Sequence, residues 1–349
     1  MRRFNRISLW RLPRNRQATD AATPTSEQGE KYNMESTGVR SSTLETIGGT
    51  PLIRLCQVVP DGAAEVLVKL ETGNPTGSYK DRMALAMIEG AERRGSLRPG
   101  QRVVEFTGGS TGSSLALVCA VKGYPLSLVS SDAFSPEKLR TMRAFGADLT
   151  VVPSEGGLVT PDLFVRMREE VQRIVERDGA FWTDQFHNAD MVAGYAEMGR
   201  EILAQAAASR RPIDVFCGAV GTAGMLVGVS QALRAGGSPV RVIAFEPATS
   251  PMLTAGVGGP HRVEGTAAGI VPPLLTRDAY DEARTVEEGE AREMAVRLAR
   301  KDGIFAGTSS ALNVVGAIAL AQELGAGRTV VTVAVDTGLK YLAGDLFEA

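Results

Sequence analysis

The chain of 349 residues carries 38 lysines and arginines against 40 aspartates and glutamates, a formal net charge of -2. This balance excludes an overall basic field that would hold nucleic acid or an anionic membrane surface, and 44% hydrophobic residues are enough for a large core. The apolar runs fall far short of the roughly 18 residues that a membrane-spanning helix needs. We therefore expect a small-molecule site, and neither a nucleic acid nor a membrane as partner.

The first 42 residues differ from the rest in composition. Six arginines precede the first acidic residue, and small polar residues follow them, which is typical of a disordered extension. An Arg-rich, acid-poor start is also typical of a mitochondrial transit peptide, but Pro13 interrupts an amphipathic helix and Met34 offers another start. We expect a disordered N-terminal extension over residues 1–42 of a cytoplasmic protein, with a mitochondrial location as the alternative.

The cysteines and histidines do not have the spacing of metal ligands. Cys56, Cys119 and Cys217 stand singly in apolar surroundings, and His187 and His261 are far apart in the sequence. This pattern predicts buried thiols in a reducing compartment, and no metal site.

From Leu44 onward, short β-branched runs alternate with helical patterns. Strands are predicted at 66–70, 103–106, 126–130, 149–152, 215–217, 240–245 and 329–335. Pro136 opens one helix that Gly146 closes, and another helix over 287–300 begins acidic and ends basic, as the helix dipole favours. The alternation predicts an α/β chain with largely parallel sheets.

The segment from Asn74 to Arg82 lies between a predicted strand and a predicted amphipathic helix. Ser78 and Asp81 have the spacing of a capping box, which places Lys80 in the first helical turn. There the positive end of the helix dipole and partial burial both lower the pKa of a lysine, so that its free amine can condense with an aldehyde. For this segment alone, an ordinary solvated lysine is the alternative.

Three further loops of small residues each lead into an apolar helix, at 107–114, 221–225 and 306–312. Backbone N–H groups at a helix start bind anions, so the first loop predicts a carboxylate site and the second a phosphate cradle. The third offers the hydroxyls of Ser309 and Ser310. The patterns of a P-loop and of a dinucleotide-binding turn are both absent.

The order of these four segments resembles that of the cysteine synthase and cystathionine β-synthase family of fold-type II pyridoxal-phosphate enzymes. The resemblance runs from IGGTPLIRL at Ile47 to DTGLKYL ending at Leu342. It implies two three-layer α/β domains like those of the tryptophan synthase β chain, at 43–190 and 191–349, with a mobile subdomain near 88–150. It also implies a homodimer, with pyridoxal 5'-phosphate in the cleft between the domains.

The resemblance implies roles for the cofactor-binding residues. Lys80 joins the cofactor covalently and takes the substrate's α-proton, and the hydroxyl of Ser309 contacts the ring nitrogen. An uncharged partner leaves this nitrogen largely unprotonated, which favours loss of a β-substituent over transamination. Ser110 stands where the family has an asparagine that contacts the cofactor. The phosphate cradle falls on Gly221, Thr222, Ala223, Gly224 and Met225, where Met225 lacks the family's hydroxyl.

The resemblance also implies a site for the substrate carboxylate. Gln185 points at the carboxylate, and Asp336 and Thr337 support the region behind the ring nitrogen. For His187 we expect a structural histidine, with an acid or a substrate contact in the cleft as the alternative. The loop that binds the carboxylate comprises Thr107, Gly108, Gly109, Ser110 and Thr111, where Gly108 replaces a serine and removes a substrate contact. Gly265 belongs to the loop at the cleft mouth, where Thr266 and Ala267 replace an isoleucine and a glycine.

These residues imply β-replacement on an activated serine, either O-acetylserine or O-phosphoserine, with sulfide or another thiol as nucleophile. A lyase that stops after β-elimination, of the cysteine desulfhydrase or serine/threonine dehydratase type, is the alternative, because one fold supports both reactions. A regulatory relative without activity is a second alternative, which the presence of Lys80 disfavours.

Overall fold

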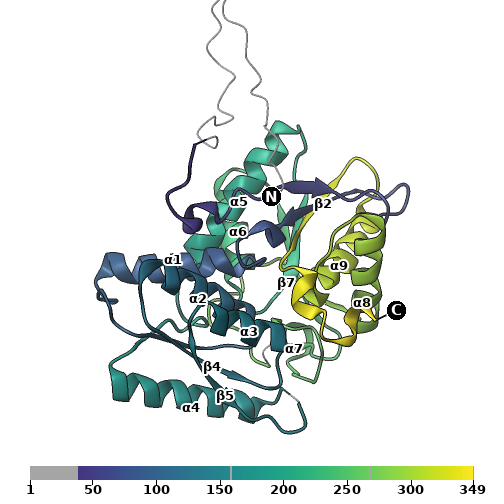
Figure 1. Cartoon of the computed structure of the whole chain (residues 1–349). Coiled ribbons are helices and arrows are strands. Elements are labelled where there is room, and N and C mark those ends of the chain that lie inside the picture. Colours follow the sequence, from purple (N-terminus) through teal and green to yellow (C-terminus); the bar gives the residue numbers. More distant parts are fainter. Residues whose placement is uncertain (1–37, 158, 267–268, 349) are drawn as a thin grey trace, which may run out of the picture. The chain divides into compact units, whose positions relative to one another are not determined.

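A computed structural model describes residues 38–157, 159–266 and 269–348. Most of the predicted N-terminal extension lies outside these residues. Within residues 40–348, two sheets and their covering helices alternate along the chain (Figure 1). The described helices include none with the length and apolar content that a membrane crossing requires.

The larger sheet has six strands in the order β1-β2-β10-β7-β8-β9. Only β1 runs antiparallel to its neighbour, and the other pairs are parallel. The strands are β1 (Leu52–Arg54), β2 (Glu65–Leu70), β7 (Val215–Ala219), β8 (Arg241–Pro247), β9 (Glu282–Val286) and β10 (Thr329–Ala334).

The smaller sheet has four parallel strands in the order β5-β4-β3-β6. They are β3 (Val103–Phe106), β4 (Leu126–Ser131), β5 (Asp148–Val152) and β6 (Phe181–Trp182). The predicted α/β fold with largely parallel sheets is confirmed, because each parallel pair needs a crossover that a helix provides.

The helices cover both faces of each sheet, as the core clusters show. Side chains of α1, α2, α5 and α6 share one cluster with inner faces of both sheets, α8 and α9 pack on the other face of the larger sheet, and α4 packs on the other face of the smaller one. The helices are α1 (Lys80–Arg94), α2 (Ser110–Lys122), α3 (Pro136–Ala144), α4 (Pro161–Asp178), α5 (Asp190–Ala208), α6 (Gly224–Ala235), α7 (Met252–Ala255), α8 (Glu288–Lys301) and α9 (Thr308–Leu324), with 3-10 turns η2 (Thr43–Thr46), η3 (Glu71–Gly73), η4 (Gly338–Tyr341) and η5 (Asp345–Phe347).

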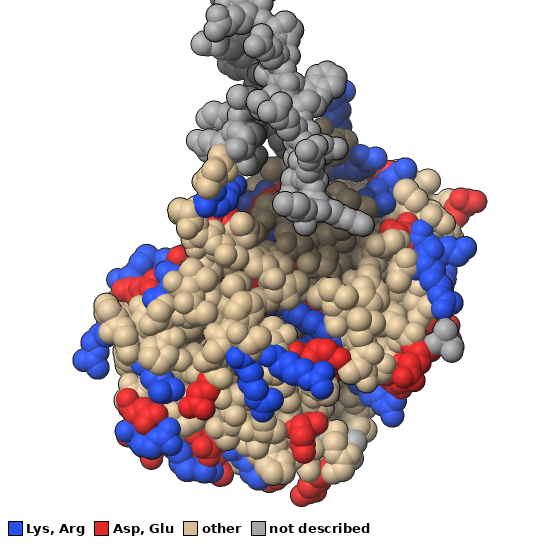
Figure 2. Space-filling model, viewed as in Figure 1, with Lys and Arg blue, Asp and Glu red and all other residues tan. Residues whose placement is uncertain are grey.

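Charged side chains of both signs are mixed over the face shown in Figure 2, as expected from the balanced composition. The predicted domain boundary at residue 190 and the mobile subdomain near 88–150 stay predictions. The pairings add one fact to them: β1 and β2, which precede residue 88, belong to the sheet formed mostly by strands that follow residue 190.

Three local predictions were wrong. Cys56 was expected to be buried and is exposed, whereas Cys119 and Cys217 are buried as predicted. The second helix begins at Ser110 rather than after Ser114, so most of the predicted carboxylate loop is the first helical turn. The capping box does not form: Ser78 Oγ accepts from Lys80 N at 3.2 Å, and the Asp81 carboxylate instead accepts from Thr76 N at 2.8 Å and from Ser114 Oγ at 2.6 Å. Better donors from the packed neighbours therefore displace the local cap. Lys80 still opens the helix, as predicted.

Candidate active site

One cavity of about 650 Å³ collects the four predicted segments. It lies beyond the carboxyl ends of β3, β7 and β10, where loops after parallel strands converge. Of the predicted site residues, the cavity is lined by Lys80, Thr107, Gly108, Gly109, Ser110, Thr111, Gln185, Gly221, Thr222, Gly265 and Ser309. Ala223, Gly224 and Met225 are buried beside it without lining it.

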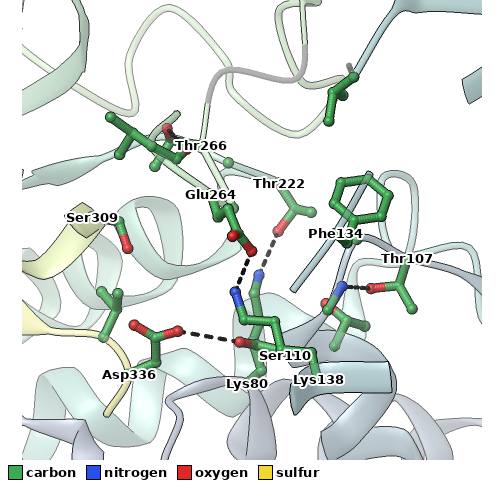
Figure 3. A pocket seen from close by; sticks show the side chains of 18 of the residues that line it. Lys80, Thr107, Ser110, Phe134, Lys138, Thr222, Glu264, Thr266, Ser309 and Asp336 are labelled. Atoms are coloured by element: carbon green, nitrogen blue, oxygen red, sulfur yellow. Dashed lines mark hydrogen bonds and ion pairs between the residues drawn. The ribbon is translucent and has the colours of Figure 1, made fainter. Parts of the chain in front are cut away.

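Lys80 points into the cavity from the first residue of α1 (Figure 3). Its side chain is 6% exposed, and burial lowers the pKa of Lys80 to about 8. The amine nitrogen lies 3.5 Å from Thr222 Oγ1 and 4.9 Å from the centre of the Tyr79 ring. A buried amine with a pKa near neutral can be free to react with an aldehyde.

A buried ion network fixes the start of α1. Arg82 Nε lies 2.7 Å from Glu71 Oε2, Arg82 Nη1 lies 2.8 Å from Glu201 Oε1, and Lys69 Nζ lies 2.6 Å from Glu201 Oε2. Burial alone would raise the pKa of Glu201, but Arg82 and Lys69 lower it to about 2. The network ties β2, η3 and α5 to the turn that carries Lys80.

The loop at 220–224 forms a cradle at the positive end of α6. A Cβ added to Gly221 would lie 2.2 Å from the carbonyl oxygen of Gly265, so only glycine lets these two loops approach. Ala223 adopts a left-handed conformation with φ of 69° before the helix begins. Met225 turns away from the cavity, since its side chain packs against Gly218. Backbone N–H groups of this helix start are therefore the donors that the cradle offers to an anion.

Ser309 lines the cavity from the first turn of α9, on the side opposite Thr107 in Figure 3. Ser310 does not share this position, because its Oγ accepts from Val335 N at 2.9 Å. Asp336 lines the cavity itself: its Oδ2 accepts from Tyr341 Oη at 2.8 Å, and its buried Oδ1 has no hydrogen-bond partner among the described residues. The cavity thus holds both an uncharged hydroxyl and an unsatisfied acceptor.

The predicted carboxylate loop is the turn into α2. Gln185 Oε1 accepts from Thr111 Oγ1 at 2.8 Å, and Gln185 Nε2 donates to the carbonyl oxygen of Phe106 at 2.9 Å. These two bonds orient the amide, and Nε2 has a second hydrogen available for a ligand. The hydroxyl of Thr107 accepts from Gly109 N at 3.1 Å and so stabilises the turn, and its own hydrogen can still be donated.

Glu105, which we did not predict as a site residue, stabilises the carboxylate loop and the turn that carries Gln185. It is fully buried at the end of β3, and burial raises its pKa to about 7 despite the hydrogen bonds that it accepts. Its Oε1 accepts from Phe106 N and Trp182 Nε1, and its Oε2 accepts from Thr183 Oγ1 at 2.6 Å and from Gln185 N at 3.0 Å. The carboxylate therefore joins the strand before the carboxylate loop to the turn that carries Gln185.

Two residues in the turn before α3 and in its first turn also reach the cavity without having been predicted. Phe134 and Lys138 both line it, and Lys138 is 3% exposed. The ammonium of Lys138 lies 2.5 Å from Glu264 Oε2 and 3.2 Å from Tyr341 Oη (Figure 3). This ion pair joins α3 to the loop at the cavity mouth. Gly108 and Gly109 before α2 were the signal in the sequence, since both leave room for these side chains.

The remaining predicted positions divide between the cavity and the surface. Thr266 lines the cavity, and its hydroxyl donates to the carbonyl oxygen of Val263 at 2.9 Å; Ala267 lies outside the described residues. His187 does not line it and contacts Asp184 at 2.9 Å on the surface, in line with a structural histidine. His261, considered only as a metal ligand, does line it. Among the described residues, histidines, cysteines and acids form no group of three that could hold a metal.

The cavity fits the cofactor that the resemblance implies. A phosphate matches the cradle before α6, where the helix start offers backbone N–H groups and Gly221 and Thr222 line the cavity. An aldehyde matches the low pKa of the Lys80 amine. A polar ring substituent matches the unsatisfied oxygen of Asp336. The three features lie on three different segments of one cavity.

Comparison with known proteins agrees with this geometry. A family model described as pyridoxal-phosphate dependent enzyme matches residues 43–336. The chain is 40% identical over 304 residues to a cysteine synthase from Staphylococcus aureus, covering 87% of this chain and 96% of that protein. It is 38% identical over 313 residues to an O-ureido-L-serine synthase from Streptomyces lavendulae, covering 88% and 93%. A solved cysteine synthase from Entamoeba histolytica superposes with a TM-score of 0.82 at 31% identity, covering 94% and 95%.

Proposed function

The chain belongs to the family of pyridoxal-phosphate-dependent enzymes, and on this premise we propose that it catalyses β-replacement on an activated serine to give cysteine or a related amino acid. The observation that carries the proposal is the placement of the Lys80 amine, buried and with a lowered pKa, between the glycine cradle and the carboxylate loop. When bound, the cofactor supplies a conjugated ring that withdraws electrons from the substrate's α-carbon.

Lys80 has two tasks in this proposal. Its amine would hold the cofactor aldehyde, and as a free amine it would accept the proton from the substrate's α-carbon. Burial suits the second task, because an amine whose pKa is about 8 exchanges a proton readily near neutral pH. Thr222 Oγ1, at 3.5 Å from the nitrogen, is close enough to orient the free amine.

The substrate's carboxylate binds at the start of α2. The free hydrogen of Gln185 Nε2 and the N–H groups of the first turn, from Ser110 to Gly112, are donors that converge on this end of the cavity. Ser309 provides an uncharged partner for the ring nitrogen, and an uncharged partner favours loss of the β-substituent.

The charges of the cavity favour O-acetylserine over O-phosphoserine. The described lining includes no arginine, and the ammonium of Lys138 is already neutralised by Glu264. A phosphate ester would bring two negative charges beside the carboxylate of Glu264, whereas an acetyl ester is neutral. We therefore propose O-acetylserine as the preferred donor substrate.

Supplying O-acetylserine with and without sulfide to the cofactor-loaded protein, and identifying products by mass spectrometry, tests the proposal. We expect cysteine only when sulfide is present. Pyruvate formed regardless of sulfide would identify the β-eliminating lyase instead. A protein that binds the cofactor and yields neither product would be a regulatory relative.

Assembly and location also belong to the proposal. We infer a homodimer from the resemblance to the family, and light scattering of the cofactor-loaded protein tests it. We infer a cytoplasmic location from the reducing surroundings that single cysteines suggest, and fractionation of cells tests it against the mitochondrial alternative.

A further inference from the structure

An aromatic ring fills the space that a side chain at position 108 would take. Phe134 lies in the turn before α3 and lines the cavity (Figure 3). A Cβ added to Gly108 would lie 2.6 Å from Phe134 Cε1, closer than real Cβ contacts come. The ring and a hydroxyl-bearing residue at 108 therefore exclude each other. The absence of a side chain at Gly108 removes a polar contact and at the same time admits an apolar one.

The neighbouring glycine admits a second side chain in the same way. A Cβ added to Gly109 would lie 2.3 Å from Lys138 Cδ. Because the ammonium of Lys138 pairs with Glu264, the alkyl stem lies over the loop while the charge is compensated. The carboxylate loop is thus covered by an aromatic ring and a neutralised ion pair.

Phe134 belongs to an aromatic wall. Phe106, Phe164 and Phe186 line the same cavity. The Phe106 ring stacks on Phe186 with centroids 6.1 Å apart and meets Phe164 edge-on at 6.5 Å. Phe134 packs against the same cluster. This wall offers aromatic faces and few hydrogen bonds to whatever lies against it.

We propose that the second substrate is a nucleophile with an aromatic or bulky apolar group, such as an aromatic thiol, and that Phe134 determines this preference. The inference rests on the proposed function and specifies the nucleophile of that reaction. Sulfide has a single heavy atom and takes roughly the volume of a water molecule, about 30 Å³. It therefore gains no binding free energy from contact with the aromatic wall. An aromatic ring gains both apolar burial and ring contacts there.

Equilibrium binding of two product amino acids tests the proposal without catalysis. S-benzyl-L-cysteine and S-methyl-L-cysteine share every group up to the sulfur, and their dissociation constants follow from the absorbance change of the bound cofactor. We expect the benzyl compound to bind about tenfold more tightly, and Phe134→Ala to weaken only this compound, by about tenfold, the effect of one aromatic contact. Phe145→Ala, at the far end of α3 and outside the cavity lining, is the matched control.

A double-mutant cycle isolates the exclusion between positions 108 and 134. Gly108→Ser alone displaces the ring and weakens binding of the benzyl compound, whereas Gly108→Ser combined with Phe134→Ala accommodates the hydroxyl and binds the methyl compound at least as tightly as the unaltered chain does. If Phe134→Ala does not fold, Phe134→Leu keeps the bulk and removes the ring. Equal affinities for both compounds, unchanged in these variants, would overturn the inference. Failure of both compounds to bind would instead contradict the proposed function.

Discussion

Glu105→Gln removes a buried negative charge while keeping the shape of the side chain. The carboxylate accepts four hydrogen bonds, two at each oxygen, and holds the turn that carries Gln185. In the variant one oxygen becomes an NH2 group that faces donors, so two of these bonds are lost. We expect the turn to loosen and the substrate carboxylate to bind less tightly.

The magnitude follows from the pKa of Glu105, which burial raises from 4.5 to about 7. The folded chain holds this proton more tightly than the unfolded chain, so the stability gained is present below pH 4.5 and is lost as the pH rises to 7; the difference corresponds to about 3 kcal/mol. Two lost hydrogen bonds to a charged group cost about 3 kcal/mol. At pH 8 the two effects offset each other, and the free energy of unfolding changes by about 1 kcal/mol or less.

Urea unfolding between pH 5 and 8 measures this. We expect the unaltered chain to lose roughly 2 to 3 kcal/mol over this range relative to the Glu105→Gln variant, because only the former carries the titrating group. The dissociation constant of S-methyl-L-cysteine provides the functional readout. We expect it to rise about tenfold in the variant at pH 8, which corresponds to the free energy of one hydrogen bond. The reasoning is refuted if the free energies of unfolding of the two proteins change in parallel with pH, or if the affinity for S-methyl-L-cysteine is the same in both.

Three further substitutions test other parts of the site. Gly221→Ala places a Cβ 2.2 Å from the oxygen of Gly265, so equilibrium dialysis should show weaker cofactor retention, while Gly289→Ala, with open space around it, should retain it fully. Arg82→Met leaves Glu71 buried without a cation and should lower the free energy of unfolding in urea by about 3 to 5 kcal/mol. Glu264→Gln frees the ammonium of Lys138, so steady-state kinetics should show the kcat/KM ratio of O-phosphoserine to O-acetylserine rising about tenfold; an unchanged ratio would contradict our account of donor choice.

The segments that carry the chemistry could be predicted because each combines a strand, a loop of small residues and a helix. Parallel strands bring their carboxyl ends to one edge, so Lys80, Thr107, Gly221 and Ser309 were expected to converge from the order of the loops, and they line one cavity. The lowered pKa of Lys80 was also predicted, from the helix dipole and from burial, and in the structure burial is the cause.

The residues that were missed depend on contacts between distant segments. Phe134 reaches the cavity only because Gly108 leaves room for its ring, and the sequence shows the glycine without its partner. Glu105 was the one charge in a buried strand of four residues, a signal that could have marked it. The capping box failed because Asp81 found donors on Thr76 and Ser114 that no local pattern reveals.

Reduction of the cofactor-loaded protein with borohydride, followed by tryptic peptide mapping, tests the central claim most directly. We predict the reduced cofactor on the peptide 70–82, attached to Lys80, and its loss from that peptide in Lys80→Arg. Attachment to a different lysine such as Lys69, or a protein that retains no cofactor after reduction, would contradict the account.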